Sequence, residues 1–358
     1  MSFRTYSRKR ATLLTVAGLT VLVGASTTTY VAARPSPADQ PVITLGTTRA
    51  SGSPAPDESG SPGPDGSGYR YRRSTSPNRT EIISSSGQPV AIMTDGARTA
   101  HIYGPSRTFK EPHFTNTTVE TNFWVRLAPH VWRAGAEKQQ WFIDWLARAR
   151  SDRSPDVLAI AMEYLYDAPA KKDKDGRQFS GDASFGPPDP ADPDGRAERS
   201  DFYDYLGESW IFPDGRKGVP EKARKLALDC SGYLRMVYGY RLGYPLRLTN
   251  TPGVGLPRRA AAMAGVGPGL QLMPNSGGRA RGLDRLLPGD LLFFNAGPVL
   301  DGHIEHSAIY LGVDDRGNHR FLSSRAQTDG PTMGDVAGEP VLDGNGYWAE
   351  RFRTARRL

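Results

Sequence analysis

The sequence predicts an α+β fold, in which a helical region is followed by antiparallel strands and preceded by a small β-rich module. Short β-like runs separated by Gly, Pro and Asn occupy residues 81 to 134. Apolar residues then recur at helical spacing over residues 136–150 and 154–165, and strand-like runs return between residues 286 and 325. Helices and strands therefore lie in separate parts of the sequence, which is typical of α+β proteins.

The first 80 residues are predicted to lie outside the folded part. Residues 1–33 combine a basic start, a mostly apolar run and small residues at positions 31–33, in the order of a secretory signal peptide. An uncleaved membrane anchor is the alternative, but Thr and Ser in its second half make a poor membrane span. We predict a cleaved signal, a secreted or cell-wall location and no stable membrane span after processing. Residues 34–80 are rich in Pro, Ser and Gly, which predicts a disordered linker.

The charge of the chain gives little reason to expect nucleic-acid binding. The 358 residues carry a net charge of +7 at pH 7, and four basic residues belong to the predicted signal peptide. The processed chain would therefore carry +3. Because a charge this small gives no general attraction to a polyanion, we expect no nucleic-acid partner. We expect a monomer.

Residues 81–150 are predicted to form the small β-rich module and one helix. The β-like runs are "PVAIM", "TAHIYG" and "VETNFWVRL". The helix is predicted over residues 136–150, because its apolar side chains gather on one face: Trp141, Phe142, Trp145 and Leu146.

Residues 151–358 are predicted to form a second domain. Its first helix is expected to begin with Ser154 as the N-cap and Pro155 at the first helical position. Residues 168–220 follow as a long polar insertion, and connections of this length are usually functional or disordered.

Cys230 is the only cysteine of the chain, and it lies in the stretch "LDCSGYLRMVYGYRLG". The apolar spacing after Asp229 predicts a helix that begins at or near Cys230 and ends by Gly243. A helix N-terminus stabilises a thiolate, which is the reactive form of the side chain. A buried cysteine that acts only as a small apolar residue is the alternative.

A cysteine nucleophile needs a base, and His306 opens the strand-like run "HSAIYLG" after the cysteine helix. A histidine at this position would point across a cleft toward a cysteine on a helix, although such histidines are often packed residues instead. Ser323 lies in the next strand-like run, "HRFLSSR", where a third residue would orient the imidazole. We therefore predict Cys230, His306 and Ser323 as the catalytic residues.

Metal-dependent chemistry is not expected. The stretch "HIEH" contains the start of a zinc deaminase signature, but that signature needs two further cysteines. The zinc peptidase motif His-Glu-x-x-His does not occur in the sequence. We predict no metal and no cofactor.

These motifs together resemble those of the NlpC-type cell-wall cysteine peptidases. "DCSGYLRMVY" is similar to the family's nucleophile motif, "LPGDLLFF" to the strand after it, and "HSAIYLG" to the strand that carries the catalytic histidine. "GLPRRAAAMAG" loosely resembles the linker between the first two motifs. The resemblance extends from about Pro155 to the C-terminus.

The resemblance implies a papain-like fold, with helices packed on an antiparallel β-sheet. It implies hydrolysis of peptide bonds in peptidoglycan stem peptides, commonly the D-glutamyl–diamino acid bond, with Cys230 as nucleophile and His306 as general base. It also implies that Asp229 and Ser231 bind substrate, although Asp229 could equally be the N-cap of the helix. Ser323 stands where the family usually has His, Asn or Gln.

Two alternatives to this endopeptidase remain at the level of sequence. One is a catalytically degenerate protein that binds the cell wall with the same fold. The other is an acyl transferase, which would keep the catalytic pair and use an amine as the acceptor.

Overall fold

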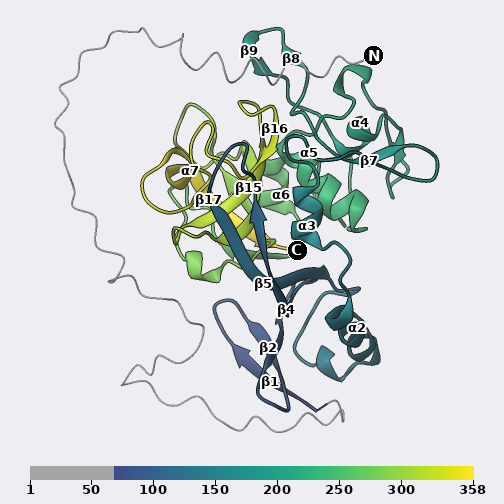
Figure 1. The fold of residues 1–358 in the computed structure, drawn as a ribbon, viewed down its shortest axis with the longest axis vertical. Coiled ribbons are helices and arrows are strands. Elements are labelled where there is room, and N and C mark those ends of the chain that lie inside the picture. Colours follow the sequence, from purple (N-terminus) through teal and green to yellow (C-terminus); the bar gives the residue numbers. More distant parts are fainter. Residues whose placement is uncertain (1–67) are drawn as a thin grey trace, which may run out of the picture. The chain divides into compact units, whose positions relative to one another are not determined.

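The structure is a computed structural model that describes residues 68–358. The predicted signal peptide and most of the predicted linker, residues 1–67, lie outside the described residues. The described chain contains two main antiparallel sheets, which Figure 1 shows in the colours of the early and the late sequence.

The first sheet has five strands that follow one another in chain order. This sheet confirms the β-rich region that was predicted ahead of the helices. Its strands are β1 (Tyr69–Ser74), β2 (Arg79–Ser84), β3 (Pro89–Thr94), β4 (Thr99–Lys110) and β5 (Thr118–Leu127).

The first sheet begins at Tyr69, so the predicted linker extends too far along the chain. Residues 69–80 form β1 and the start of β2, which pair in antiparallel register. The reason is the alternation of Tyr and Arg in β1, "YRYRRS", which puts Tyr69 and Tyr71 against the apolar core of this sheet. The linker was predicted from amino-acid composition, and this segment is too rich in polar residues for composition to indicate a strand.

The predicted helix after the first sheet is confirmed. The 3-10 helix η3 (Ala136–Lys138) leads into α2 (Gln140–Ser151). Phe142 and Leu146 are fully buried against the first sheet, whereas Trp141 and Trp145 are only partly buried beside them.

The next helix, α3 (Val157–Met162), begins later than predicted. Its N-cap is Asp156 and not Ser154, because the Asp156 carboxylate accepts a hydrogen bond from the Ala159 N–H at 3.0 Å. The same carboxylate accepts from the Val125 N–H at 2.6 Å and pairs with Arg107, so it ties α3 to β5 and β4.

The predicted insertion over residues 168–220 contains ordered short elements. Helix α4 (Phe202–Leu206) begins with a capping box. The Asp201 side chain accepts a hydrogen bond from the Asp204 N–H, and the Asp204 side chain accepts one from the Asp201 N–H. Three two-stranded hairpins accompany it: β6 (Lys171–Lys172) with β7 (Gln178–Ser180), β8 (Pro188–Asp189) with β9 (Asp192–Arg196), and β10 (Trp210–Ile211) with β11 (Lys217–Gly218).

The second sheet has six strands in the order β12-β17-β13-β14-β15-β16. The predicted strands over residues 306–312 and 319–325 are confirmed as β14 and β15. The strands are β12 (Leu270–Met273), β13 (Leu291–Phe294), β14 (His306–Val313), β15 (His319–Arg325), β16 (Gly330–Thr332) and β17 (Phe352–Arg357).

Each face of the second sheet packs against a different part of the chain. Phe293, Ile309 and Leu322 face one core, which they share with α3 and the cysteine helix α5 (Cys230–Leu234). Phe294 and Phe321 face a second core, which contains Trp348 of helix α7 (Tyr347–Arg351). Figure 1 shows α3 and α5 on one side of β15 and β17, and α7 on the other side.

Candidate active site

Cys230 is the first residue of helix α5, as the sequence predicts. Asp229 is the N-cap, since its carboxylate accepts a hydrogen bond from the Gly232 N–H at 2.7 Å. A stretch of wider π-helical turns, η5 (Arg235–Arg241), continues the helix. The thiol therefore lies at a helix N-terminus, where unpaired N–H groups favour negative charge.

The Asp229 carboxylate is fully occupied by neighbouring groups. Besides the Gly232 N–H, it accepts hydrogen bonds from the Arg199 N–H at 2.9 Å and from Arg258 at 2.8 Å. Ser231 donates its hydroxyl to the same carboxylate at 3.0 Å. Burial acts to raise the pKa of Asp229, but Arg258 and the hydrogen bonds outweigh it and hold that pKa below its usual value. Asp229 is thus ionised and structural here, while a role in substrate binding stays a prediction.

Arg258 also belongs to the site, although the sequence did not predict a role for it. It comes from the stretch "GLPRR", and it donates to the Ser231 hydroxyl at 2.7 Å while pairing with Asp229 and Asp201. Asp201 also pairs with Arg235, and both side chains of that pair are fully buried. This network joins the start of α5 to the insertion, because Asp201 caps α4.

The insertion also contacts the cysteine helix through its backbone. The Asp229 N–H donates to the Ser200 carbonyl at 2.9 Å, and the Leu228 N–H donates to the Ser184 carbonyl at 2.8 Å. A Cβ atom on Gly232 would lie 2.1 Å from the Ser200 oxygen. Only glycine leaves room for this approach, which explains the glycine of "DCSG" in physical terms.

The Cys230 thiol lies against the start of β14. Its sulfur is 3.8 Å from the Glu305 carbonyl oxygen, to which the S–H donates. The side chain is 7% exposed, and burial raises the pKa of the thiol to about 12, with the charges of Asp229 and Glu198 adding to the rise. Hydrogen bonding from the backbone and side chain of Ser307 opposes this rise. Sequence reasoning missed Ser307, although it stands directly after the predicted base.

The His306 ring packs on the opposite face of the second sheet from Ser307. His306 pairs in register with Phe294, whereas Ser307 pairs with Phe293 of the helix-facing core. The ring centroid of His306 is 4.7 Å from that of Trp348. Burial, with a further contribution from Arg325, lowers the pKa of His306 to about 3, so the imidazole is neutral.

The structure therefore brings the thiol to the residues on either side of His306 without joining the two side chains. Nε2 of His306 is buried and has no hydrogen-bond partner among residues 68–358. No hydrogen bond within that part of the chain connects the ring to the sulfur of Cys230. The Cys230 sulfur thus lies beside the residue that precedes His306 in the chain, and a direct contact between the thiol and the imidazole stays a prediction.

Ser323 lies on the same face of the second sheet as His306. The register pairs Leu322 with Ile309 on the helix-facing side, so the next residue, Ser323, points to the other side. Its side chain is fully buried, and its hydroxyl has no hydrogen-bond partner among the described residues. Ser324 instead donates to the Leu228 carbonyl, just before the cysteine helix.

Residues 68–358 contain neither a metal-binding cluster of side chains nor a membrane-spanning helix. No group of three or more His, Cys, Asp or Glu side chains in residues 68–358 is arranged to hold a metal ion. None of the helices in this range combines the length and the apolar character that crossing a bilayer requires.

Comparison with known proteins matches the C-terminal part of the chain to one protein family. Residues 217–357 match the model of the NlpC/P60 family, so the predicted resemblance is confirmed over these residues, a shorter stretch than the one predicted from about Pro155. The match supports a cell-wall peptidase function, without specifying which bond is cleaved.

One solved structure, from Staphylococcus aureus subsp. aureus Mu50, is described as similar to a lipoprotein of the NLP/P60 family. It is 18% identical, with a TM-score of 0.25, and the alignment covers 62% of this chain and 49% of that chain. This chain thus spans about half the length of that protein, and a likeness this weak supports no further conclusion. Curated proteins showed no match.

Proposed function

We propose that this NlpC/P60 domain is a secreted cysteine endopeptidase with a papain-like site that hydrolyses peptidoglycan stem peptides at the D-glutamyl–diamino acid bond. The observation that carries the proposal is the position of Cys230. It begins a helix, and its sulfur lies against the start of the strand that bears His306. Secretion is proposed from the pattern of residues 1–33 alone.

In the proposed reaction, the His306 imidazole takes the proton of the Cys230 thiol, and the thiolate attacks the carbonyl carbon of the stem peptide. Backbone N–H groups at the start of α5 donate to the oxyanion that forms. The imidazolium then protonates the leaving amine, and a water molecule hydrolyses the thioester. The low pKa of His306 suits the first step, because a base must enter the reaction neutral.

The resting site needs a rearrangement before this proton transfer. The thiol has a raised pKa and the imidazole a lowered pKa, so both groups are neutral at pH 7. We infer that substrate binding brings the ring and the sulfur within hydrogen-bond reach, which is about 3 Å. Ser307 is proposed to stabilise the thiolate, since its hydroxyl is buried and has no other partner in the described chain.

Ser323 is proposed as the third catalytic residue because it shares a sheet face and a buried position with His306. A Ser323→Ala variant tests this role, and the expected result is a fall in kcat with little change in KM. Full activity of Ser323→Ala would exclude Ser323 from the catalytic residues. Asp229 and Ser231 are also proposed to contact the substrate. Because both side chains are already bound to Arg258, they would do so as part of this hydrogen-bonded group.

The test of the function uses purified peptidoglycan and mass spectrometry of the released peptides. The Cys230→Ala and His306→Ala variants are expected to release no stem-peptide fragments. His303→Ala is the matched control, because His303 is an exposed histidine just before β14 and pairs only with Asp301 among the described residues. Undiminished release by the Cys230→Ala variant would refute the proposal.

A catalytically degenerate wall-binding protein is the second candidate function. The buried thiol without a bond to His306 is the observation that favours it. Co-sedimentation with cell walls, together with no labelling of Cys230 by a cysteine-peptidase inhibitor, would support it. An acyl transferase would instead form a new amide when a free amine is added to the reaction.

A further inference from the structure

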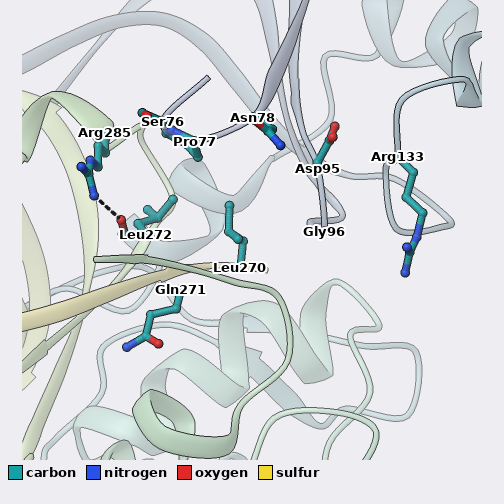
Figure 2. Close-up of a pocket in the computed structure, with 10 residues that line it drawn as sticks. All are labelled: Ser76, Pro77, Asn78, Asp95, Gly96, Arg133, Leu270, Gln271, Leu272 and Arg285. Carbon is teal, nitrogen blue, oxygen red and sulfur yellow. Dashed lines mark hydrogen bonds between the residues drawn. The ribbon is translucent and has the colours of Figure 1, made fainter. Parts of the chain in front are cut away.

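A pocket of about 600 Å³ lies where two turns of the first sheet meet the second sheet, and Cys230 is not among the residues that line it. Figure 2 shows the side chains that line it. They come from the β1–β2 turn (residues 76–78), the β3–β4 turn (residues 95 and 96), Arg133, the edge strand β12 (residues 270–272) and Arg285. None of the proposed catalytic residues belongs to this lining.

Two arginines, Arg133 and Arg285, contribute positive charge to the pocket lining. Neither Arg133 nor Arg285 forms an ion pair with any residue in the part of the chain that the structure describes. The one acidic residue of the lining, Asp95, is already paired with Arg73 through two hydrogen bonds, of 2.8 and 2.7 Å. The lining therefore has an excess of positive charge, and guanidinium groups match carboxylates in geometry.

Arg285 is held in place before any ligand arrives. Its side chain donates to the Leu272 carbonyl at 3.1 Å, and its own carbonyl accepts hydrogen bonds from Arg79 and Arg357. Arg357 is itself buried in a pair with Asp290. A charge fixed in this way loses little freedom when it binds an anion.

The pocket also contains a sheet edge. β12 is the first strand in the order of the second sheet, so only β17 pairs with it among the described strands. The free side of an edge strand presents backbone N–H and C=O groups that can pair with an extended peptide. Leu270 and Pro77 add an apolar surface between the charged ends, and Figure 2 shows Arg285 and Arg133 on opposite sides of them.

We propose that this pocket binds an acidic peptide in an extended conformation. The peptide main chain pairs with β12, and its carboxylates bind Arg133 and Arg285. An elongated ligand is required because the two arginines lie on opposite sides of the lining. This binding site is separate from the chemistry of Cys230 and stands whether or not the domain is a peptidase.

The test measures binding of a fluorescein-labelled hexapeptide of alternating Glu and Val to the full chain. The Cys230→Ala variant serves as the host, so that cleavage does not interfere. Arg133→Gln and Arg285→Gln are each expected to weaken binding by about tenfold, through loss of a charge-assisted hydrogen bond. Lys138→Gln is the matched control, because it removes an exposed positive charge outside the pocket lining and is expected to leave the affinity unchanged.

Two variants of the peptide make the test decisive. Replacing Glu by Gln is expected to abolish binding, and methylation of alternate backbone nitrogens is expected to weaken it at least about tenfold. Equal affinity of either variant peptide would overturn the proposal. It would also be overturned if the peptide failed to bind while poly(glycerol phosphate) bound, since the site would then recognise phosphate polymers.

Discussion

Replacing Gly232 by alanine tests the contact between the cysteine helix and the insertion. An added Cβ would lie 2.1 Å from the Ser200 oxygen and 3.0 Å from the Asp201 Cα. Both are backbone positions, and neither is free to move. The Ser200 carbonyl accepts from the Asp229 N–H, and the Asp201 side chain is fixed by its buried pair with Arg235. Relief of the clash requires a shift of about 1 Å between the two segments.

The expected effect is a loss of about 2 kcal/mol in the free energy of unfolding. Overpacking of a well-packed region costs about 2 kcal/mol, and loss of the bond between Asp229 and Ser200 costs about 1 kcal/mol. Alanine recovers about 1 kcal/mol through its higher helix propensity. Propensity alone therefore predicts stabilisation, whereas the tertiary contact predicts destabilisation, and the sign of the change decides between them.

Urea unfolding followed by tryptophan fluorescence measures this change. Gly265→Ala is the matched control, because Gly265 lies in helix α6 (Ala260–Val266) and a Cβ there has no atom within 4 Å. The control is expected to be more stable by up to about 1 kcal/mol. A Gly232→Ala variant as stable as the unsubstituted chain would refute the close contact with the insertion.

Three further predictions concern the electrostatics of the site. Ser307→Ala is expected to raise the pKa of the Cys230 thiol further, because a hydrogen-bond donor to the sulfur is lost, and so to slow alkylation by iodoacetamide about tenfold at a given pH; an unchanged rate would exclude Ser307 as a donor. Trp348→Leu is expected to raise the pKa of His306 from about 3 toward its ordinary value, because burial is the main cause of its depression, and NMR titration of the ring measures the change. Asp229 has a lowered pKa in the folded state, so the stability that it contributes is present above about pH 4 and is lost as the pH falls further. At pH 7 the free energy of unfolding of Asp229→Asn is therefore expected to be about 3 kcal/mol lower than that of the unsubstituted chain. This difference in stability should become smaller below about pH 4. A deficit that stays constant over this pH range would contradict the role given to the carboxylate.

Local patterns predicted the elements with a strong period or a local cap. β14 and β15 match their predicted runs because each carries a short apolar run, residues 308–311 in β14 and residues 321–322 in β15. The N-cap of α3 was predicted two residues early, since Ser154 and Asp156 are both good caps and the contacts of Asp156 with β4 and β5 decide between them.

The C-terminal strand β17 could not be predicted from its sequence. The segment "FRTARR" looks polar, yet the structure buries it in the middle of the second sheet. Burial is tolerated because Arg357 finds Asp290, and Arg353 and Arg356 donate to backbone carbonyls elsewhere in the chain. The six residues of β17 alone do not show that distant parts of the chain supply partners for its arginines.

In the candidate site, too, some features follow from the local sequence and others only from the tertiary structure. The sequence by itself determined that Cys230 begins a helix, because the Asp229 cap is a hydrogen bond to a residue only three positions away. Tertiary structure decided what surrounds the thiol and the imidazole: Ser307 at the sulfur, Trp348 on the His306 ring and Arg258 on Asp229. The physical reason is desolvation, since the protonation states of Cys230 and His306 depend on burial by segments far apart in the chain.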